Sequence, residues 1–368
     1  MHRTTSKILP LLTGLGLSGC GSDSPSDTGD GVGTIEVTAA TTGDDIDPAF
    51  TVLVGGQTLD LASNGSLQIG SLTPGVHAVS LDGVADNCSV AGDNPQSATV
   101  AADQTTTVAF VITCVVILPP NTLVAADRVG NFYTIDETTG AETLFLDTST
   151  DDGLGGTTDV GVVSSMHWIP TTSVWWLGTG GNGTCTGCIQ TLDLTTGVAT
   201  TLIDVANGVS GLAVHPTTEK IYTFESDGTN IVFEVDATTG VLTPLFTGLG
   251  LLNGGGGTTF SQAEALFVAA RNELWSVDLQ TGAPTLIGAM TYTGFPAFTQ
   301  ASQTIGSMAT RPSDGVVFGL LKDGGNSGAL QPTFLVQVNL ATAEITNVGV
   351  QTHLMDGLAF IQSSLIGG

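Results

Sequence analysis

The chain has 368 residues, with 34 acidic side chains against 7 basic ones and a formal charge of −27. A surface this negative repels phosphate backbones, which excludes nucleic-acid partners, and it is typical of an extracellular protein exposed to salt. The 50 glycines favour many turns and short strands over long helices. The length allows two or three domains.

The first twenty residues, MHRTTSKILPLLTGLGLSGC, have the pattern of an export signal. Arg3 and Lys7 precede an apolar run that is too short to remain as a membrane anchor. The run ends in Leu17-Ser18-Gly19-Cys20, which resembles the bacterial lipobox, whose cysteine is acylated and becomes the mature N-terminus. The resemblance implies a signal peptide over 1–19 and lipidation at Cys20.

Gly21 follows the cysteine in place of the aspartate that resembles an inner-membrane retention signal, which favours the outer membrane or the cell surface. Residues 20–32 are rich in glycine, serine and aspartate and have no apolar period, so they are predicted to form a flexible tether.

Residues 33–116 contain short β-rich runs separated by turn residues. Alternating apolar and polar residues over 34–38 and 106–110 predict half-buried strands. About seven such strands predict a small β-sandwich. Cys88 and Cys114 fall at strand ends in an oxidising compartment, so a disulfide between them is expected.

The sequence Leu72-Thr73-Pro74-Gly75-Val76-His77-Ala78-Val79, followed by Asn87-Cys88, resembles small immunoglobulin-like (Ig-like) modules of bacterial surface proteins. The resemblance spans the whole 33–116 region and implies an Ig-like sandwich.

After the stiff linker Leu118-Pro119-Pro120, a turn motif of the form Asp-x-x-Thr-Gly recurs, each time after a strand-like run. Aspartate can cap such a turn with its side chain, and glycine supplies a positive φ before the next strand. The copies begin at Asp136, Asp193, Asp236 and Asp278, and a decayed copy begins at Asn339.

A second repeated element lies upstream of three of these copies, at 165–170, 211–216 and 307–312, whereas the first copy has no such partner. A matching element, Gly357-Leu358-Ala359-Phe360-Ile361, stands at the far end of the chain. Units of about 40 residues with four short strands are typical of β-propeller blades. The missing and surplus elements predict that Asp356–Ile361 is the innermost strand of the blade formed by Leu123–Phe145, which closes the ring.

The repeats resemble the broad class of bacterial extracytoplasmic propellers with a Val-Asp-x-x-Thr-Gly turn. The resemblance implies an all-β chain whose sandwich is followed by a propeller over 121–363, with five units recognised. The insertions 148–163 and 289–304 leave room for a further blade, and the alternative architecture is a second, larger β-sandwich.

Three residues of the repeats are candidates for a site in the channel. His167 stands in a column that holds alanine in other units, and Asp356 leads the final inner strand, where a carboxylate could act as a general acid or bind a cation. Arg311 follows an inner strand at a position that varies between units. Each residue also has a structural interpretation: packing beside Trp168, hydrogen bonding to a neighbouring blade, and a variable turn position.

Cys185 and Cys188 lie between two strands of one unit without the helix that a thioredoxin-like site needs, so a second disulfide is expected. The aspartates at 44, 45, 47, 147, 151 and 152 cluster in loops without the spacing of a calcium loop. No metal or other cofactor is therefore expected, with loop-bound calcium as the alternative.

The first functional hypothesis is a lipid-anchored cell-surface binding or scaffolding protein that uses the propeller to recognise an unknown protein or polysaccharide, without being an enzyme. The second is a hydrolase or lyase that acts on an extracellular polymer in the channel. A pair of carboxylates, or a histidine and a carboxylate, at the mouth of the channel would favour the second hypothesis. A purely structural role in the envelope is the third.

The lipobox predicts that Cys20 holds the protein on a membrane. A Cys20→Ser variant should move from the membrane fraction to the soluble fraction on cell fractionation, because it loses the acylated thiol. Ser24→Ala, a change of similar size in the tether, should leave the distribution unchanged. A Cys20→Ser protein that stays with the membrane would show that the anchor lies elsewhere.

Overall fold

The structure of the protein is a computed structural model that describes residues 31–43, 45–115, 117–147, 160, 163–169, 174–179, 187–192, 199–204, 209–225, 232–246, 257–296, 298, 303–323 and 332–362. The signal peptide, Cys20 and nearly all of the tether lie outside these residues, so their predictions remain predictions. The regular elements of the described residues are strands, as expected for an all-β chain. None of these residues forms a helix long and apolar enough to cross a membrane.

The first eight strands form two four-stranded sheets, one strand more than the sequence predicts. The first sheet, in the order β4-β1-β8-β6, contains β1 (Gly33–Gly43), β4 (Ser66–Leu72), β6 (Cys88–Ala91) and β8 (Thr105–Cys114). The second, in the order β3-β2-β5-β7, contains β2 (Ala49–Val54), β3 (Gln57–Ala62), β5 (Gly75–Asp82) and β7 (Gln96–Val100).

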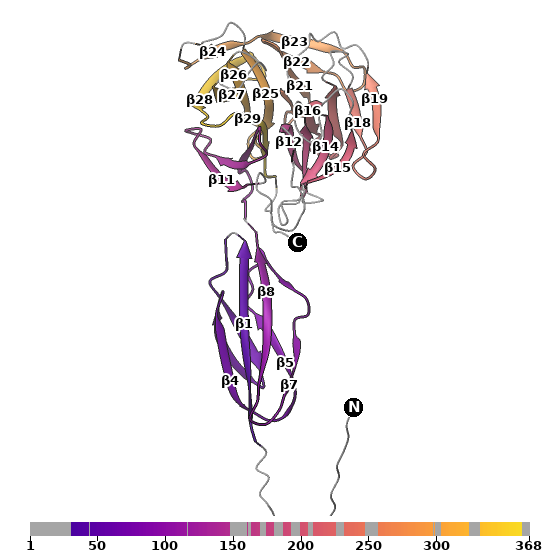
Figure 1. The fold of residues 1–368 in the computed structure, drawn as a ribbon. Helices are drawn as coiled ribbons and strands as arrows, with labels where there is room; N and C mark the ends of the chain where they lie inside the picture. The colour runs from indigo at the N-terminus through magenta and orange to yellow at the C-terminus, as the bar shows by residue number, and fades with distance from the viewer. Residues whose placement is uncertain are drawn as a thin grey trace, which may run out of the picture.

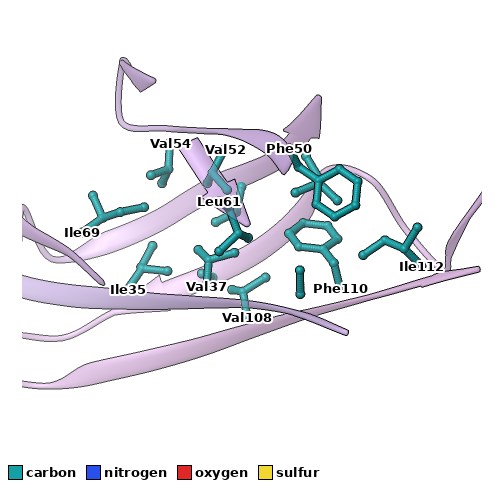
Figure 2. Close-up of a cluster of buried hydrophobic side chains, with 14 of the residues drawn as sticks. Ile35, Val37, Phe50, Val52, Val54, Leu61, Ile69, Val108, Phe110 and Ile112 are labelled. Atoms are coloured by element: carbon teal, nitrogen blue, oxygen red, sulfur yellow. The ribbon is translucent and has the colours of Figure 1, made fainter. Parts of the chain in front are cut away.

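The two sheets enclose one apolar core (Figure 2), to which residues such as Val37, Phe50 and Phe110 contribute from alternate positions of their strands. The alternation of buried and exposed residues along β1 and β8 is the one predicted from the sequence. A β-sandwich is therefore present, and its Ig-like character stays a prediction.

A disulfide joins Cys88 and Cys114, as predicted. The two cysteines face each other across the β6–β8 ladder. Both cysteines lie in the first sheet, and the bond closes a loop with a sequence separation of 26 residues that includes β7 of the second sheet.

The remaining strands form five sheets arranged about a common axis (Figure 1). From the outermost strand to the innermost, the first blade contains β11 (Glu142–Leu146), β10 (Phe132–Ile135), β9 (Leu123–Asp127) and β29 (Met355–Phe360). The second and third blades, from inside to outside, contain β12 (Val163–Ile169), β13 (Val174–Thr179), β14 (Cys188–Leu192) and β15 (Ala199–Asp204), then β16 (Val209–Val214), β17 (Ile221–Glu225), β18 (Val232–Val235) and β19 (Leu242–Phe246).

The fourth blade contains β20 (Gly257–Phe260), β21 (Leu266–Ala270), β22 (Glu273–Val277) and β23 (Pro284–Ala289). The fifth contains β25 (Gln303–Thr310), β26 (Val317–Asp323), β27 (Thr333–Val338) and β28 (Glu344–Val350), with the short strand β24 (Thr291–Thr293) added outside β28. The described strand β24 of the insertion over 289–304 thus extends the fifth blade.

The innermost strands contact one another in a complete circle: β29 packs beside β12, β12 beside β16, β16 beside β20, β20 beside β25, and β25 beside β29. The ring is therefore closed with five blades, and the alternative of a second sandwich is wrong. Closure depends on the C-terminal strand, since β29 pairs antiparallel with β9 and places Phe360 opposite Leu123. The closure predicted from the missing inner element is confirmed.

The repeated turns have the predicted geometry. The Asp136 carboxylate accepts hydrogen bonds from the backbone of Thr138 and Thr139, and Gly140 adopts a positive φ of 75°. Hydrogen bonds from the side chain and backbone of Thr138, followed by those of Thr139, lower the pKa of Asp136 to about 2. Ala343, which replaces glycine in the decayed copy, keeps a left-handed φ of 58°.

These turns also join the blades. Gly140 of the first blade lies against Gly349 of the fifth, where an added Cβ on Gly349 would come within 2.1 Å of the Thr139 carbonyl oxygen. Gly240 of the third blade likewise packs against Leu202 of the second. The glycine of the motif thus adopts its positive φ at little steric cost and permits the close approach between blades.

Removal of the C-terminal strand should unfold the propeller. In β29 and just after it, Met355, Leu358, Phe360 and Ile361 are buried, and their burial contributes roughly 6–12 kcal/mol, which is as large as the stability of a typical domain. A chain truncated after residue 354 should therefore be insoluble or lose its cooperative thermal transition. A chain truncated after residue 362, which keeps β29, should melt as the full chain does, and equal melting of both truncations would contradict this role of β29.

Loss of the Cys88–Cys114 disulfide should weaken the sandwich. In the double variant Cys88→Ala/Cys114→Ala, the free energy of unfolding of the sandwich should fall by about 3 kcal/mol, because the unfolded chain regains the entropy of an open loop. Chemical denaturation should show this loss in the sandwich transition, with the propeller transition unchanged. An equal shift of both transitions would show that the two regions unfold as one unit.

Candidate functional site

The two ends of the propeller differ in the lengths of their connections. The strands of each blade are counted here from the innermost to the outermost. At one end of the ring lie the connections from first to second strand and from third to fourth strand, and all of them are four to six residues long. At the other, the connections from second to third strand and from blade to blade vary from two residues (271–272) to sixteen (147–162). We call these the uniform end and the variable end. Variable connections on a rigid scaffold are typical of recognition surfaces.

Asp356 lies at the variable end, at a position that four blades share. Near the start of the innermost strand, one residue has no partner in the register with the neighbouring strand. This skipped residue is Ser164 in the second blade, Ser210 in the third, Gly306 in the fifth and Asp356 in the first. Ser164 and Ser210 donate their hydroxyl hydrogen bonds to backbone carbonyls of their own or the next blade. A one-residue irregularity of this kind redirects a side chain, and in the closing blade that side chain is a carboxylate.

The Asp356 carboxylate is buried between two cations. Its Oδ2 accepts a hydrogen bond from Arg128 Nε at 2.7 Å, and its Oδ1 forms an ion pair with Lys322 Nζ. The side chains of Asp356 and Lys322 are 5% and 10% exposed, whereas that of Arg128 is 29% exposed. The three residues, here called the seam cluster, join the fifth blade to the first.

Arg128 and Lys322 occupy equivalent positions in their blades. In the first blade, Asp127 pairs with Met355, the residue before the skipped Asp356, and Arg128 follows Asp127. In the fifth blade, Leu321 pairs with Ile305, the residue before the skipped Gly306, and Lys322 follows Leu321. Lys322 passes over Gly306, where an added Cβ would lie 3.0 Å from Lys322 Cε, so the absence of a side chain there makes room for it. Burial lowers the pKa of Lys322, while Asp356 opposes the decrease.

The turn that carries Arg128 is held by Asp127. Its Oδ1 accepts hydrogen bonds from the backbone N–H groups of Val129 and Asn131, and its Oδ2 accepts one from the Tyr133 hydroxyl at 3.2 Å. Burial, followed by the charge of Asp127, raises the pKa of Tyr133 to about 12. The Arg128 backbone is thus fixed by a carboxylate that takes no part in the ion pairs.

A histidine and a carboxylate also meet beside this turn. His353 Nδ1 lies 2.6 Å from Glu142 Oε2, and the imidazole stacks on the Tyr133 ring with centroids 4.8 Å apart. Burial acts to raise the pKa of Glu142, but hydrogen bonds from Thr352 and His353 outweigh it and lower this pKa. The Glu142 side chain is 6% exposed and that of His353 is 49% exposed, so the imidazole is open to solvent on one side.

Arg311 lies at the uniform end, away from Asp356. It follows the last residue of β25, whereas Asp356 is near the start of β29, so the two lie at opposite ends of the ring. Arg311 forms ion pairs with Asp314 and with Glu137 of the first blade, and its guanidinium lies 5.6 Å from the Phe318 ring centroid. The structure therefore gives this candidate a structural role between the fifth and first blades.

His167 lies in the middle of β12, where it is half-buried, and its Nδ1 is 3.0 Å from the Trp168 carbonyl oxygen. Burial lowers its pKa. Ala213, which holds the same column, packs into the core toward the next blade. The geometry agrees with a packing role.

Cys188 is disulfide-bonded, but Cys185, its predicted partner, lies outside the described residues. Asp45 and Asp47 accept backbone hydrogen bonds from Ile117 and Ala85, which is a structural use of two of the clustered aspartates. Asp44, Asp151 and Asp152 lie outside the described part of the chain. No group of three or more potential metal ligands occurs among the residues that the structure describes.

Four residues of these sites, Arg128, Lys322, Glu142 and His353, are not among the candidates that the sequence predicts. A signal was available for the cations, because Arg128 and Lys322 are two of only five basic residues after residue 30. Their equivalence depends on the skipped position in the strand pairing, which a sequence of decayed repeats does not reveal. Glu142 and His353 are 211 residues apart in the chain.

No family model matches the chain, and no curated protein matches it. Several solved structures are similar in part. TolB from Acinetobacter baumannii has a TM-score of 0.36 and 13% identity, over 85% of this chain and 66% of that chain. An auxiliary nutrient binding protein from Bacteroides thetaiotaomicron has a TM-score of 0.38 and 14% identity, over 86% and 85%. Hydrazine synthase from Kuenenia stuttgartiensis has a TM-score of 0.33 and 13% identity, over 53% and 51%.

Proposed function

We propose that the protein is an exported, lipid-anchored binding protein of the cell surface, whose propeller recognises a polysaccharide or protein with its variable end. In this proposal Cys20 is the anchor, and the sandwich is a stalk that separates the propeller from the membrane. The observation that carries the proposal is the contrast between the two ends of the ring. At the uniform end every connection has four to six residues, whereas at the variable end the range is two to sixteen.

This contrast argues for recognition because both ends belong to the same repeated unit. The turns of the uniform end pack between blades, as Gly140 and Gly240 do, so their lengths are constrained by the ring itself. At the variable end the five blades accept connections of two to sixteen residues, so the ring does not fix the length of these connections. Length variation that the scaffold does not require is typical of surfaces that contact a partner.

The seam cluster favours binding over polymer hydrolysis. A glycosidase acid must offer a free carboxyl oxygen to the leaving group, and a second carboxylate must stand nearby. Both oxygens of Asp356 are engaged, one by Arg128 and the other by Lys322. Asp356 is therefore used to hold two blades together.

The alternative, a hydrolase or lyase, is supported by one observation, which is the pair His353–Glu142. A carboxylate that accepts the Nδ1 proton leaves Nε2 as a base, and the imidazole is open to solvent. The same contacts also hold the 351–354 connection against the first blade, since Glu142 accepts a hydrogen bond from the Thr352 backbone at 2.7 Å. The structural use of the pair suffices to explain its geometry.

Shortening the variable end should abolish binding without unfolding the ring. The full chain would be tested by affinity electrophoresis against a panel of extracellular polysaccharides, with release of reducing ends measured in parallel. In the test variant, 247–256 is replaced by the sequence of 205–208, and 324–332 by that of 128–131, since other blades make the same connections with four residues. Retention of the chain by a polysaccharide should disappear, and its melting temperature should change little.

In the control variant the turn 278–283 of the uniform end is replaced by the equal-length turn 236–241. It should be retained as the unaltered chain is. Retention that survives both shortened connections would place recognition elsewhere. Release of reducing ends that disappears in His353→Gln would establish the alternative and overturn the binding-only proposal.

A further inference from the structure

Arg128 uses only part of its guanidinium within the seam cluster. Nε donates to Asp356 Oδ2, and among the described residues neither terminal nitrogen, Nη1 or Nη2, has a partner. The side chain is 29% exposed, in a turn of four residues at the variable end. The hydrogen bond at Nε fixes the plane of the group, so the two terminal nitrogens form an oriented fork open to a ligand.

The charges of the seam cluster do not balance. Two cations share one carboxylate, and Lys322 is nearly buried, with a side chain 10% exposed. A buried charge without a full counter-charge is costly. Burial lowers the pKa of Lys322, and the charge of Arg128 adds to the decrease, while Asp356 opposes it. One further negative charge beside Arg128 and Lys322 would neutralise the cluster.

We propose that Arg128, supported by Lys322, binds the carboxylate of a small acidic ligand, of the class of sugar acids, at the variable end of the propeller. The proposal deepens the proposed function and rests on it only for the biological source of the ligand. A planar carboxylate matches the fork of Nη1 and Nη2 through two parallel hydrogen bonds. A tetrahedral anion such as sulfate can also engage the fork, but its two negative charges exceed the one charge that the cluster lacks. A single negative charge also equals the deficit of the cluster.

The strong negative charge of the chain does not prevent this binding. At physiological salt the Debye length is about 8 Å, so distant surface carboxylates are screened while the two cations act on the ligand directly. Of the five basic residues after residue 30, two are placed together in the seam cluster. The site is thus a small positive region on an acidic surface, which would select a ligand by its carboxylate at short range.

Calorimetric titration of the full chain with sodium D-galacturonate tests the proposal, with D-galactose and sodium sulfate as comparison probes. Galacturonate should bind with a Kd of about 1 mM, and galactose should not bind detectably. Arg128→Gln should weaken galacturonate binding at least about tenfold, because two charge-assisted hydrogen bonds are lost. Arg128→Lys should keep the ion pair with Asp356 and the melting temperature but also bind more weakly, since an ammonium group has no fork.

Lys220→Gln is the matched control. It removes the same unit of charge from an exposed ion pair with Glu234 at the uniform end, so it should leave galacturonate binding unchanged. Failure of galacturonate to bind, equal binding of sulfate, or equal weakening by Lys220→Gln would overturn the proposal. If a neutral polysaccharide retains the chain but galacturonate does not bind, only this inference is overturned. If galacturonate binds but no polymer retains the chain, only the proposed function is overturned.

Discussion

The structure depends on the pairing of the first and last strands of the propeller. The first blade lacks an innermost strand of its own, and β29 supplies it from the other end of the chain. The seam between the fifth and first blades carries Arg128, Arg311 and Lys322, each paired with a carboxylate. In a chain with so few cations, three of the five after residue 30 are used where the ends must be held together.

At this seam the repeats also depart from one another. At the skipped position of the inner strand, the serine hydroxyls of the second and third blades donate hydrogen bonds to backbone carbonyls. In the first blade the residue at this position is Asp356, which pairs with the side chains of Arg128 and Lys322. The closure therefore brings ionic groups to an end of the ring whose connections vary in length. A contact that stabilises the ring and a surface that can bind a ligand share residues here, as Arg128 illustrates.

The sequence predicts the parts of the fold that are local or repeated. Alternation predicts the strands of the sandwich, the Asp136 turn follows from its residue types, and the surplus element Gly357–Ile361 predicts the closing strand. The candidates of the site fare less well. Asp356 is at the variable end as its position in the repeat suggests, but Arg311 is at the other end because it follows an inner strand instead of preceding one.

What the sequence by itself determined is therefore the all-β class, the five units and the Cys88–Cys114 pairing, since each depends on periodicity, turn chemistry or strand ends. Only the tertiary structure decided which charges meet. Arg128 contacts Asp356 across 228 residues of sequence, and Lys322 reaches it through the space above Gly306. These contacts depend on the register of the strands and on how neighbouring blades pack, and no local pattern of residues encodes either.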